Sequence, residues 1–400
     1  MAKKLQFKIS TGLKNIIGKE LITDDFVAIF ELVKNSYDAK AKKVTIEFHD
    51  IKKGSEKSRI SIIDDGDGMS YDDLINRWLF VGYSAKKEDP DKQQEDYRDR
   101  IEKKKRVFAG AKGIGRFSVD RLGGKLKLYT KKTEASTIHQ LDINWNQFEK
   151  NQEKEFQQIK TIYSTSHHWP KDYPELSGRK KGTVLEISGL NEEWDGKKLL
   201  KLRRTLQRMI NPSLDPDSKD FQIELVAKEF EIEDSGKRKK GKEYEVINGP
   251  IKNLVFEKLK IKTIQIVCEI RDDKITTTLT DKGRWIFELR EENPYHKLRD
   301  ARIFIFFLNE ESKADFKRIM GLRTVEYGSI FRYKNGFRVY PYGEPGDDWL
   351  GLERRKGQGV YRNLAAREVI GRIEVYGSQA DFRETSSREG VTETEEVKQL

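Results

Sequence analysis

The chain of 400 residues is poor in cysteine, methionine and proline, with one, four and nine of them. The single cysteine, Cys268, excludes an internal disulfide and a cysteine-based metal cluster. It lies in the alternating run IQIVCEI, which predicts a buried structural thiol. No apolar run approaches the ~20 residues of a bilayer span, and the start MAKKLQFKIS lacks the apolar stretch of a secretory signal. We therefore expect a cytoplasmic protein without a membrane partner.

The charge balance leans to the basic side, with 78 Lys and Arg against 67 Asp and Glu and a net charge of +11. A basic excess favours an anionic partner such as a nucleotide or a nucleic acid. Much of the lysine, however, stands in mixed runs such as GKRKKGKEYE, which resemble exposed loops more than a DNA-reading face. The charge leaves both an anionic partner and an ordinary solvated surface open.

Two common phosphate-binding signatures are also absent, although residues 108–117, FAGAKGIGRF, form a glycine-rich loop. A P-loop requires Lys and then Ser or Thr after its last glycine, but Arg116 follows Gly115. The dinucleotide pattern GxGxxG fails because Ser118 stands in place of its third glycine. Glycine still lets several N–H groups converge on phosphates, and a helix that begins near Gly115 would add its own. The loop by itself decides nothing.

A helix is predicted from Thr23 to about Ala41, because Thr and Asp residues open it. Glu31, Asn35 and Asp38 are spaced i, i+4 and i+7 and fall within an arc of roughly 60°. An amide oxygen one turn from a carboxylate suits Mg²⁺, and a glutamate there can activate water for attack on a phosphoryl group. The alternative is an ordinary solvated face. The opposite side is apolar and predicts core contact through Phe26, Ile29, Leu32 and Val33.

The run IIDDGDGMS brings a strand end into a glycine turn. Asp64 ends the strand, and Gly66 and Gly68 leave room for a flat ligand. A carboxylate there can accept a hydrogen bond from an exocyclic amine such as that of adenine. A calcium loop is excluded because Met69 and Ser70 occupy positions that its pattern reserves for other residues. A simple hairpin-like turn remains the alternative.

Strand-like alternation surrounds these motifs. Strands are predicted at KVTIEF, SRISIID, KLKLYT, IHQLDIN, GTVLEIS and FQIELV, and a basic helix at DGKKLLKLRRTLQRMI. Thr183 begins the GTVLEIS run, where its hydroxyl can reach an adenine through water. The very polar residues 84–106 before the glycine loop would form a mobile lid. Further along, ARIFIFFL, GSIFRYKNGFRVY and RNLAAREVIGRIEV predict a second α/β domain.

The order of these motifs resembles that of the GHKL ATPases over about residues 20–190. This superfamily comprises gyrase-type topoisomerases, MutL-type repair proteins, ninety-kilodalton heat-shock chaperones, MORC proteins and sensor histidine kinases. The shared order is a carboxylate/Asn helix, an Asp-x-Gly-x-Gly turn, a GxxGxG loop and a Gly-Thr strand. The resemblance implies a Bergerat-type α/β sandwich that holds ATP and Mg²⁺ between its helices and a lid.

The resemblance also implies roles for individual residues. Glu31 is the general base, Asn35 is the Mg²⁺ ligand and Asp64 binds adenine. The piece VGYSAKK resembles the GxSxK segment of MORC proteins, which adds Lys86 to the phosphate contacts. The full set of predicted nucleotide-binding residues is Asn35, Asp38, Asp64, Gly66, Gly68, Met69, Lys86, Gly110, Lys112, Gly113, Ile114, Gly115 and Thr183.

The second half carries further resemblances. ETSSREG resembles the SRE segment of the heat-shock chaperones and implies that Arg388 reaches the γ-phosphate as a second catalytic residue. YKNGFRV resembles the VNGR strand of MutL-type proteins and implies an S5-type transducer domain. Arg354, Arg355 and Lys356 in LERRKG compete for the phosphate-sensing role. A histidine kinase is disfavoured, since those enzymes usually lack a glutamate at the position of Glu31.

These inferences predict an α+β protein in which a Bergerat-type α/β sandwich precedes an S5-like α/β transducer. We expect an N-terminal strap at residues 1–20 and the ATPase domain at 21–228, with a lid at about 84–118. A charged loop or linker is expected at 229–245 and the transducer at 246–400. The polar end GVTETEEVKQL predicts that the protein continues into a further region.

The predicted activity is Mg²⁺-dependent ATP hydrolysis that closes a homodimer onto a macromolecular client. The basic charge and the MORC- and MutL-like pieces favour DNA as the client, whereas the SRE element favours a protein and a chaperone-like role. An ATP-binding scaffold with little turnover is the alternative from a different class.

Overall fold

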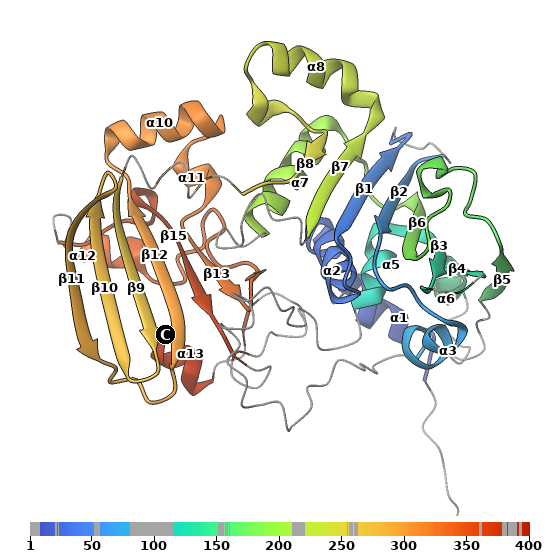
Figure 1. Cartoon of the computed structure of the whole chain (residues 1–400), viewed down its shortest axis with the longest axis horizontal. Helices are drawn as coiled ribbons and strands as arrows, with labels where there is room; N and C mark the ends of the chain where they lie inside the picture. Colours follow the sequence, from blue (N-terminus) through green and yellow to red (C-terminus); the bar gives the residue numbers. More distant parts are fainter. Residues whose placement is uncertain are drawn as a thin grey trace, which may run out of the picture.

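The computed structural model places two mixed α/β units side by side, each built on one large sheet (Figure 1). This confirms the predicted α+β class. Among the described residues, no helix has both the length and the apolar character that a bilayer crossing demands. The residues described are 9–20, 22, 24–51, 57–80, 115–133, 135, 137–150, 156, 159, 161–209, 221–253, 255, 259, 263–359, 362–377, 382, 390–391 and 394–400.

The first sheet has eight strands in the order β5-β4-β3-β6-β2-β1-β7-β8. Its strands pair antiparallel except for the parallel pair of β1 and β7. All six strands predicted for this half are present, and β5 and β8 are additional. The bounds are β1 (Lys43–His49), β2 (Arg59–Asp64), β3 (Gly123–Lys131), β4 (Ile138–Asn144), β5 (Ile162–Ser166), β6 (Gly182–Leu190), β7 (Gln222–Ala227) and β8 (Gly249–Pro250).

The predicted first helix is α2 (Asp25–Asp38), three residues shorter at its end than expected. It begins where it does because the Asp24 carboxylate accepts hydrogen bonds from the N–H groups of Phe26 and Val27, at 2.6 and 3.2 Å. Beyond its end, Lys40 takes a left-handed φ of 61°, which a continuing helix does not allow.

A layer of helices packs on the first sheet through one hydrophobic core. α2 contributes Ile29 and Val33, both 0% exposed, and α7 (Gly196–Met209) contributes Leu202 and Leu206. α7 is the predicted basic helix. The remaining elements of this unit are α1 (Leu13–Asn15), the π-helical turn Ile16–Glu20, α3 (Tyr71–Asp73), the π-helical turn Leu74–Trp78, the 3-10 turns Gly115–Phe117 and Pro174–Leu176, α5 (Ser118–Leu122) and α6 (Asn146–Lys150).

The stretch 229–245, predicted as an exposed loop or linker, is largely helical. α8 (Glu231–Lys239) lies between the 3-10 turns Lys228–Phe230 and Glu243–Glu245. Acidic residues in its first turn and basic residues in its last turn match the helix dipole, which favours a helix in a very polar sequence. Its fully buried Asp234 accepts hydrogen bonds from the N–H groups of Ile247 and Asn248. The prediction of a loop was wrong because the pattern of charge was taken for solvation alone.

The second sheet has seven strands in the order β11-β10-β9-β12-β15-β13-β14. All of its pairs are antiparallel except β13 with β15. The bounds are β9 (Ile264–Arg271), β10 (Lys274–Asp281), β11 (Arg284–Glu292), β12 (Asp300–Phe307), β13 (Ile330–Lys334), β14 (Phe337–Val339) and β15 (Val369–Val375). Helical elements accompany it as α10 (Glu310–Met320), α11 (Thr324–Tyr327), α12 (Leu352–Gln358), the 3-10 turn Ala366–Glu368 and α13 (Glu395–Gln399).

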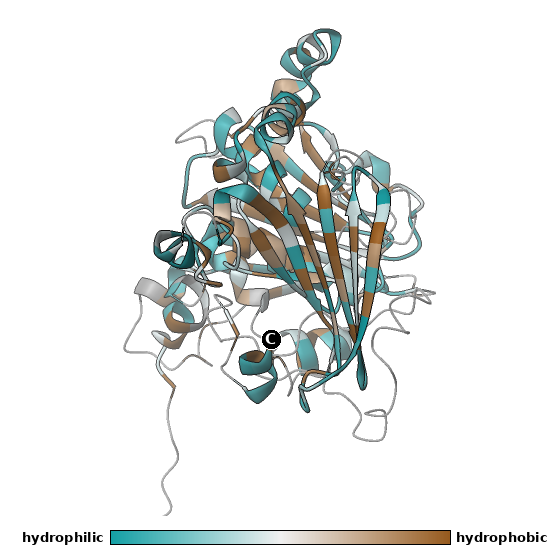
Figure 2. Cartoon of the chain, turned by 90° about the vertical axis from the view of Figure 1, so that its left-hand side faces the viewer, coloured by the Kyte–Doolittle hydropathy of each residue, from teal (hydrophilic) through white to brown (hydrophobic). Residues whose placement is uncertain are grey.

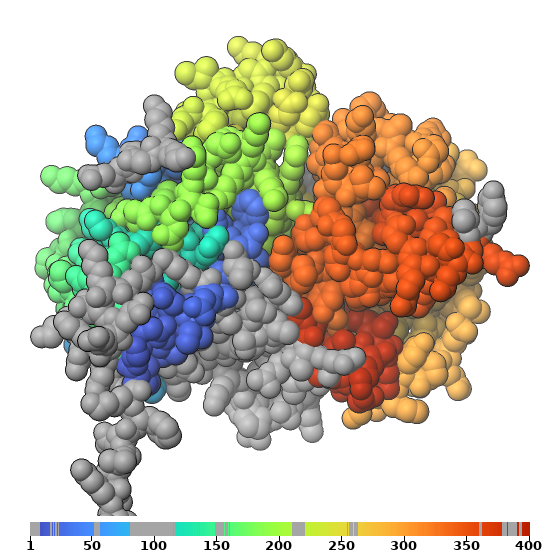
Figure 3. All heavy atoms as spheres, turned by 180° about the vertical axis from the view of Figure 1, so that it is seen from behind, coloured from blue at the N-terminus to red at the C-terminus, as the bar shows by residue number. Residues whose placement is uncertain are grey.

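The two units contact each other through the β13–β14 hairpin and the segments on either side of it. Phe337, at the start of β14, packs against Phe30 and Tyr37 of α2, with ring centroids 6.2 and 4.7 Å apart. Arg208 of α7 donates to the carbonyl of Tyr327 at 2.7 Å and pairs with Glu344 at 3.2 Å. Seen from behind, atoms of the N-terminal unit meet those of the second unit along a common boundary (Figure 3).

Candidate functional site

The polar residues predicted on one face of α2 differ in their exposure. Glu31 is only 3% exposed, whereas Asn35 and Asp38 are half-buried. Lys34, itself 2% exposed, lies with its Nζ atom 3.2 Å from Glu31 Oε1. A glutamate is seldom buried unless a partner compensates its charge. The burial therefore argues against the alternative of an ordinary solvated face.

Asp64 lies at the end of β2, directly beside α2. Its carboxylate accepts hydrogen bonds from the Ser36 hydroxyl at 3.1 Å and from the Gly66 N–H at 2.9 Å. Burial raises the pKa of Asp64 to about 6, against the lowering effect of these two donors. The site thus holds a carboxyl group that ionises near pH 6 and whose ionised form one further hydrogen-bond donor would stabilise.

Thr183 faces this carboxyl group from the neighbouring strand. β2 and β6 pair so that Asp64 stands opposite Thr183. The Thr183 hydroxyl lies 3.1 Å from that of Thr130 on β3, and the Met69 N–H donates to Thr130 Oγ1 at 2.9 Å. Three strand positions and the turn after β2 therefore converge on one small polar cluster.

The two glycines of the turn after β2 meet backbone that leaves no room for a side chain. Gly68 has a left-handed φ of 67°, and a Cβ atom there would lie 1.9 Å from the Lys131 carbonyl oxygen. A Cβ atom at Gly66 would lie 2.7 Å from the Ala39 carbonyl oxygen and 2.9 Å from Asp64 Oδ1. The turn is consequently packed against neighbouring backbone at both glycines, which fixes its position beside Asp64.

The end of the glycine-rich loop packs against the acid and the amide of α2. A Cβ atom built on Gly115 would lie 3.3 Å from Glu31 Oε2 and 3.5 Å from Asn35 Nδ2. The short helical segment that follows, Gly115–Phe117 and then α5, begins at this point. A group held by the loop would therefore meet the polar side of α2.

Six predicted residues cannot be placed. Lys86, Gly110, Lys112, Gly113, Ile114 and Arg388 lie outside the described residues, as does the predicted lid apart from residues 115–118. The competing residues Arg354, Arg355 and Lys356 belong to α12, on the side of the second sheet away from α2 (Figure 1). Lys356 pairs with Glu368 there, at 3.2 Å. The structure does not bring this group to the site.

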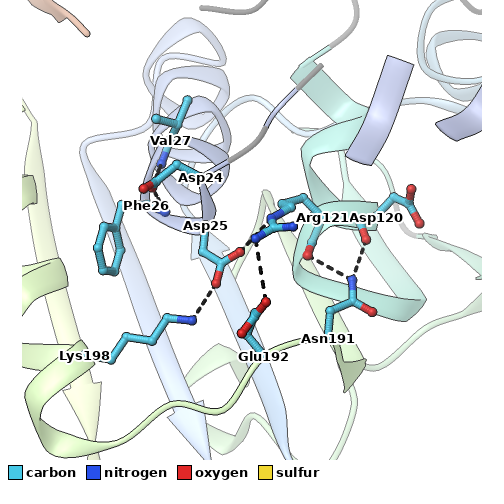
Figure 4. Close-up of polar contacts among 9 residues, drawn as sticks. All are labelled: Asp24, Asp25, Phe26, Val27, Asp120, Arg121, Asn191, Glu192 and Lys198. Carbon is cyan, nitrogen blue, oxygen red and sulfur yellow. Dashed lines mark hydrogen bonds and ion pairs between the residues drawn. The ribbon is translucent and has the colours of Figure 1, made fainter. Parts of the chain in front are cut away.

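The helices that carry the site are tied together at their ends (Figure 4). Asp25, in the first turn of α2, pairs with Arg121 of α5 at 2.8 Å and with Lys198 of α7 at 2.6 Å. Arg121 also lies 3.8 Å from Glu192. Since α5 directly follows the glycine-rich loop, these pairs hold the loop end and α2 in one arrangement.

The sequence analysis missed several residues of the site. Ser36 lies 140° from Glu31 around the helix, outside the polar arc that the spacing defined. Thr130 sits in a run that reads as an ordinary strand, and the Arg179 guanidinium donates to the Asp64 carbonyl at 3.2 Å from a loop. The alternation of β3 was the only signal for Thr130, and no local pattern pointed to Arg179.

The donor set suits a nucleotide with its metal ion better than a metal ion alone. No group of three or more His, Cys, Asp or Glu residues in the described ranges is placed to hold a metal. The Asn35 amide, close to the backbone at Gly115, instead fits Mg²⁺ that keeps phosphate and water ligands.

Comparison with known proteins agrees with this geometry. Residues 23–183 match the family of histidine kinase-, DNA gyrase B- and HSP90-like ATPases. The match begins just before α2 and ends at Thr183, so it spans the residues that the structure brings together. No curated protein matches the chain.

Proposed function

We propose that the protein, whose residues 23–183 match the family of histidine kinase-, DNA gyrase B- and HSP90-like ATPases, binds Mg²⁺–ATP between α2, the ends of β2 and β6, and the glycine-rich loop, and hydrolyses it. The observation that carries the proposal is the contact of Gly115 with Glu31 and Asn35 beside the buried Asp64. One end of this cluster suits phosphates and the other suits a purine.

Each end of the site has its own chemistry. At the phosphate end, Glu31 is placed to accept a proton from an attacking water, and Asn35 would hold Mg²⁺, which would supply positive charge against the phosphates. Asp38 and Gly115 complete this end. At the purine end, the Asp64 carboxylate accepts a hydrogen bond from the adenine amine, while Gly66, Gly68 and Met69 form the wall of the turn and Thr183 assists through water.

The direct test measures ATP binding by calorimetry and phosphate release from ATP. We expect binding that requires Mg²⁺, turnover, and clear preference for ATP over GTP, because guanine presents a carbonyl where adenine presents its amine. Protein that is folded but binds ATP and GTP equally would contradict the assignment of Asp64. Binding without turnover by wild type would favour the scaffold alternative.

ATP affinity should depend on pH. Asp64 has a pKa of about 6 with the site empty, and an adenine amine favours its ionised form. Binding then releases a proton below pH 6, so the affinity falls about tenfold per pH unit as pH drops below 6 and is constant above it. Calorimetry in buffers of different ionisation enthalpy counts this proton, with Mg²⁺ present to keep the phosphates ionised. An affinity unchanged from pH 5 to 7 would contradict the role of Asp64.

We further infer that nucleotide drives closure of a homodimer. The N-terminal segment supports this, because it packs on the helix that follows the glycine-rich loop: Lys14 of α1 pairs with Asp120 of α5 at 2.8 Å, and both are 1% exposed. A conformational change of the glycine-rich loop can therefore be transmitted through α5 to the N-terminal segment.

The client, DNA or protein, is tested by salt-dependent retention on DNA with and without a non-hydrolysable ATP analogue.

The second unit is proposed to act as a transducer through the β13–β14 hairpin. Phe337→Ala should lower ATP turnover about tenfold while ATP affinity changes less than about threefold, because the hairpin then loses its contacts with Phe30 and Tyr37 beside Glu31. Phe307→Ala, which truncates a half-buried phenylalanine of β12, is the matched control. Equal effects of the two variants on turnover would show a loss of stability alone.

A further inference from the structure

The edge strand β11 exposes an unusual amount of apolar surface. All nine of its residues are exposed, among them Trp285 at 65%, Ile286 at 49%, Phe287 at 45% and Leu289 at 47%. No other described strand pairs with its outer side. Figure 2 looks at this side of the molecule, where hydrophobic stretches of the strands face the viewer without a helix in front.

The apolar residues continue from the edge into the sheet. Phe287 stands opposite Leu279 on β10, Leu279 stands opposite Ile266 on β9, and Ile266 stands opposite Ile305 on β12. Paired residues share one face of a sheet, so these four side chains form a row across four strands. The register shifts between Leu279 and Thr280, where Ile286 is the extra residue on β11, so Phe287–Glu292 is the regular part of this strand.

The two edge strands of this sheet differ in whether another element covers them. The opposite edge strand, β14, is covered because its Phe337 packs against α2. Proteins usually protect open edges with charged residues, proline, a β-bulge or a covering element. β11 has no lysine or proline in its sequence RWIFELREE, and its charges are of both signs, while its one bulge lies at Ile286. A long edge of this kind is a template for another strand.

We propose that β11 pairs antiparallel with β11 of a second copy of this chain, which joins two seven-stranded sheets. The sequence of β11 complements itself about Glu288: Phe287 then faces the partner's Leu289, and beyond the bulge at Ile286 the faces match so that Arg284 lies opposite the partner's Glu291, next to Glu292. The two copies of Glu288 meet at the centre, and each has its own Arg290 within 2.7 Å to offset its charge. The two-fold symmetry repeats every favourable contact.

This contact goes beyond the proposed nucleotide-driven closure, because it involves the second unit alone and requires no ATP. A chain with both contacts has two separate self-complementary surfaces. A single pair of strands buries little area, so we expect dissociation in the micromolar range, on the order of 1–50 μM.

Sedimentation velocity of the nucleotide-free chain at about 1–100 μM tests the apolar part of the contact. We expect a monomer–dimer equilibrium that Phe287→Lys weakens at least about tenfold. The control Ile232→Lys replaces a residue of α8 that is 91% exposed, and should leave the equilibrium unchanged. A monomer throughout this range, or a dimer that Phe287→Lys does not weaken, would overturn the proposal.

Charge reversal tests the register independently of folding. Arg284→Glu alone and Glu291→Arg with Glu292→Arg should each weaken self-association, because each places like charges together at both ends of the paired strands. An equimolar mixture of the two variants should recover dimers, since both ends then pair opposite charges. Dimers that form equally in all three samples would exclude this register and with it the proposed contact. An unchanged thermal melt shows that each variant is folded.

Discussion

Replacing Glu31 with glutamine should reduce ATP turnover by about 10²–10⁴-fold and change ATP affinity less than about threefold. The amide has nearly the same shape as the carboxylate but accepts no proton from water. Binding is preserved because the adenine contacts and the Asn35 amide are untouched. Turnover is followed by phosphate release, and affinity by calorimetry on the same preparation.

The matched control for this variant is Glu47→Gln. Glu47 on β1 is also a buried glutamate, at 7% exposure, and lies within 3.5 Å of His49 Nε2 and 3.4 Å of Lys228 Nζ. Since Glu31 lies 3.2 Å from the buried Lys34 Nζ, each variant also needs a thermal melt. Turnover that survives Glu31→Gln in folded protein, or falls equally in Glu47→Gln, would remove Glu31 from the reaction.

Replacing Asp64 with asparagine should weaken ATP binding at least about 100-fold while the empty protein becomes more stable. The asparagine turns a donor toward either the Ser36 hydroxyl or the adenine amine, so one of them loses its acceptor. Asp64 has a pKa of about 6 in place of its ordinary 3.8, so above pH 6 its ionisation costs the fold about 3 kcal/mol.

The sign of the stability effect follows from that raised pKa. The folded state holds the proton more tightly than the unfolded state, so the cost is absent below about pH 4 and grows until about pH 6. Asparagine removes this cost, and its gain in melting temperature should therefore appear above pH 6 and vanish at pH 4.

Asp234→Asn is the informative control for Asp64→Asn. Asp234 of α8 is also buried, at 0% exposure, and accepts backbone N–H bonds, but its partners are Ile247 and Asn248 and not residues of the site. We expect it to lose stability and to keep its ATP affinity, the reverse of Asp64→Asn. If Asp64→Asn lowers the melting temperature and keeps its affinity, Asp64 has a structural role only.

The parts of the fold that sequence patterns predicted are those with a local cause. α2 follows from its Asp24 cap and its apolar stripe, and six strands of the first sheet follow from alternation. β10 and β11 were not predicted, although the Lys282–Gly283 turn between them has the positive φ values, 47° and 80°, of a tight hairpin. Their threonine-rich and charged residues weaken the contrast on which alternation depends.

Motif order along the chain predicted the ATPase family that residues 23–183 match, and the resemblance to that family gave Glu31, Asn35 and Asp64 as expected site residues. Only the packing of β2 against β3, β6 and α2 decided which side chains surround Asp64, and hence its raised pKa. The contact of Phe337 with α2 and the open edge at β11 likewise depend on strand order. All of these features depend on contacts between residues far apart in the chain, and no local sequence pattern determines how deeply such residues are buried.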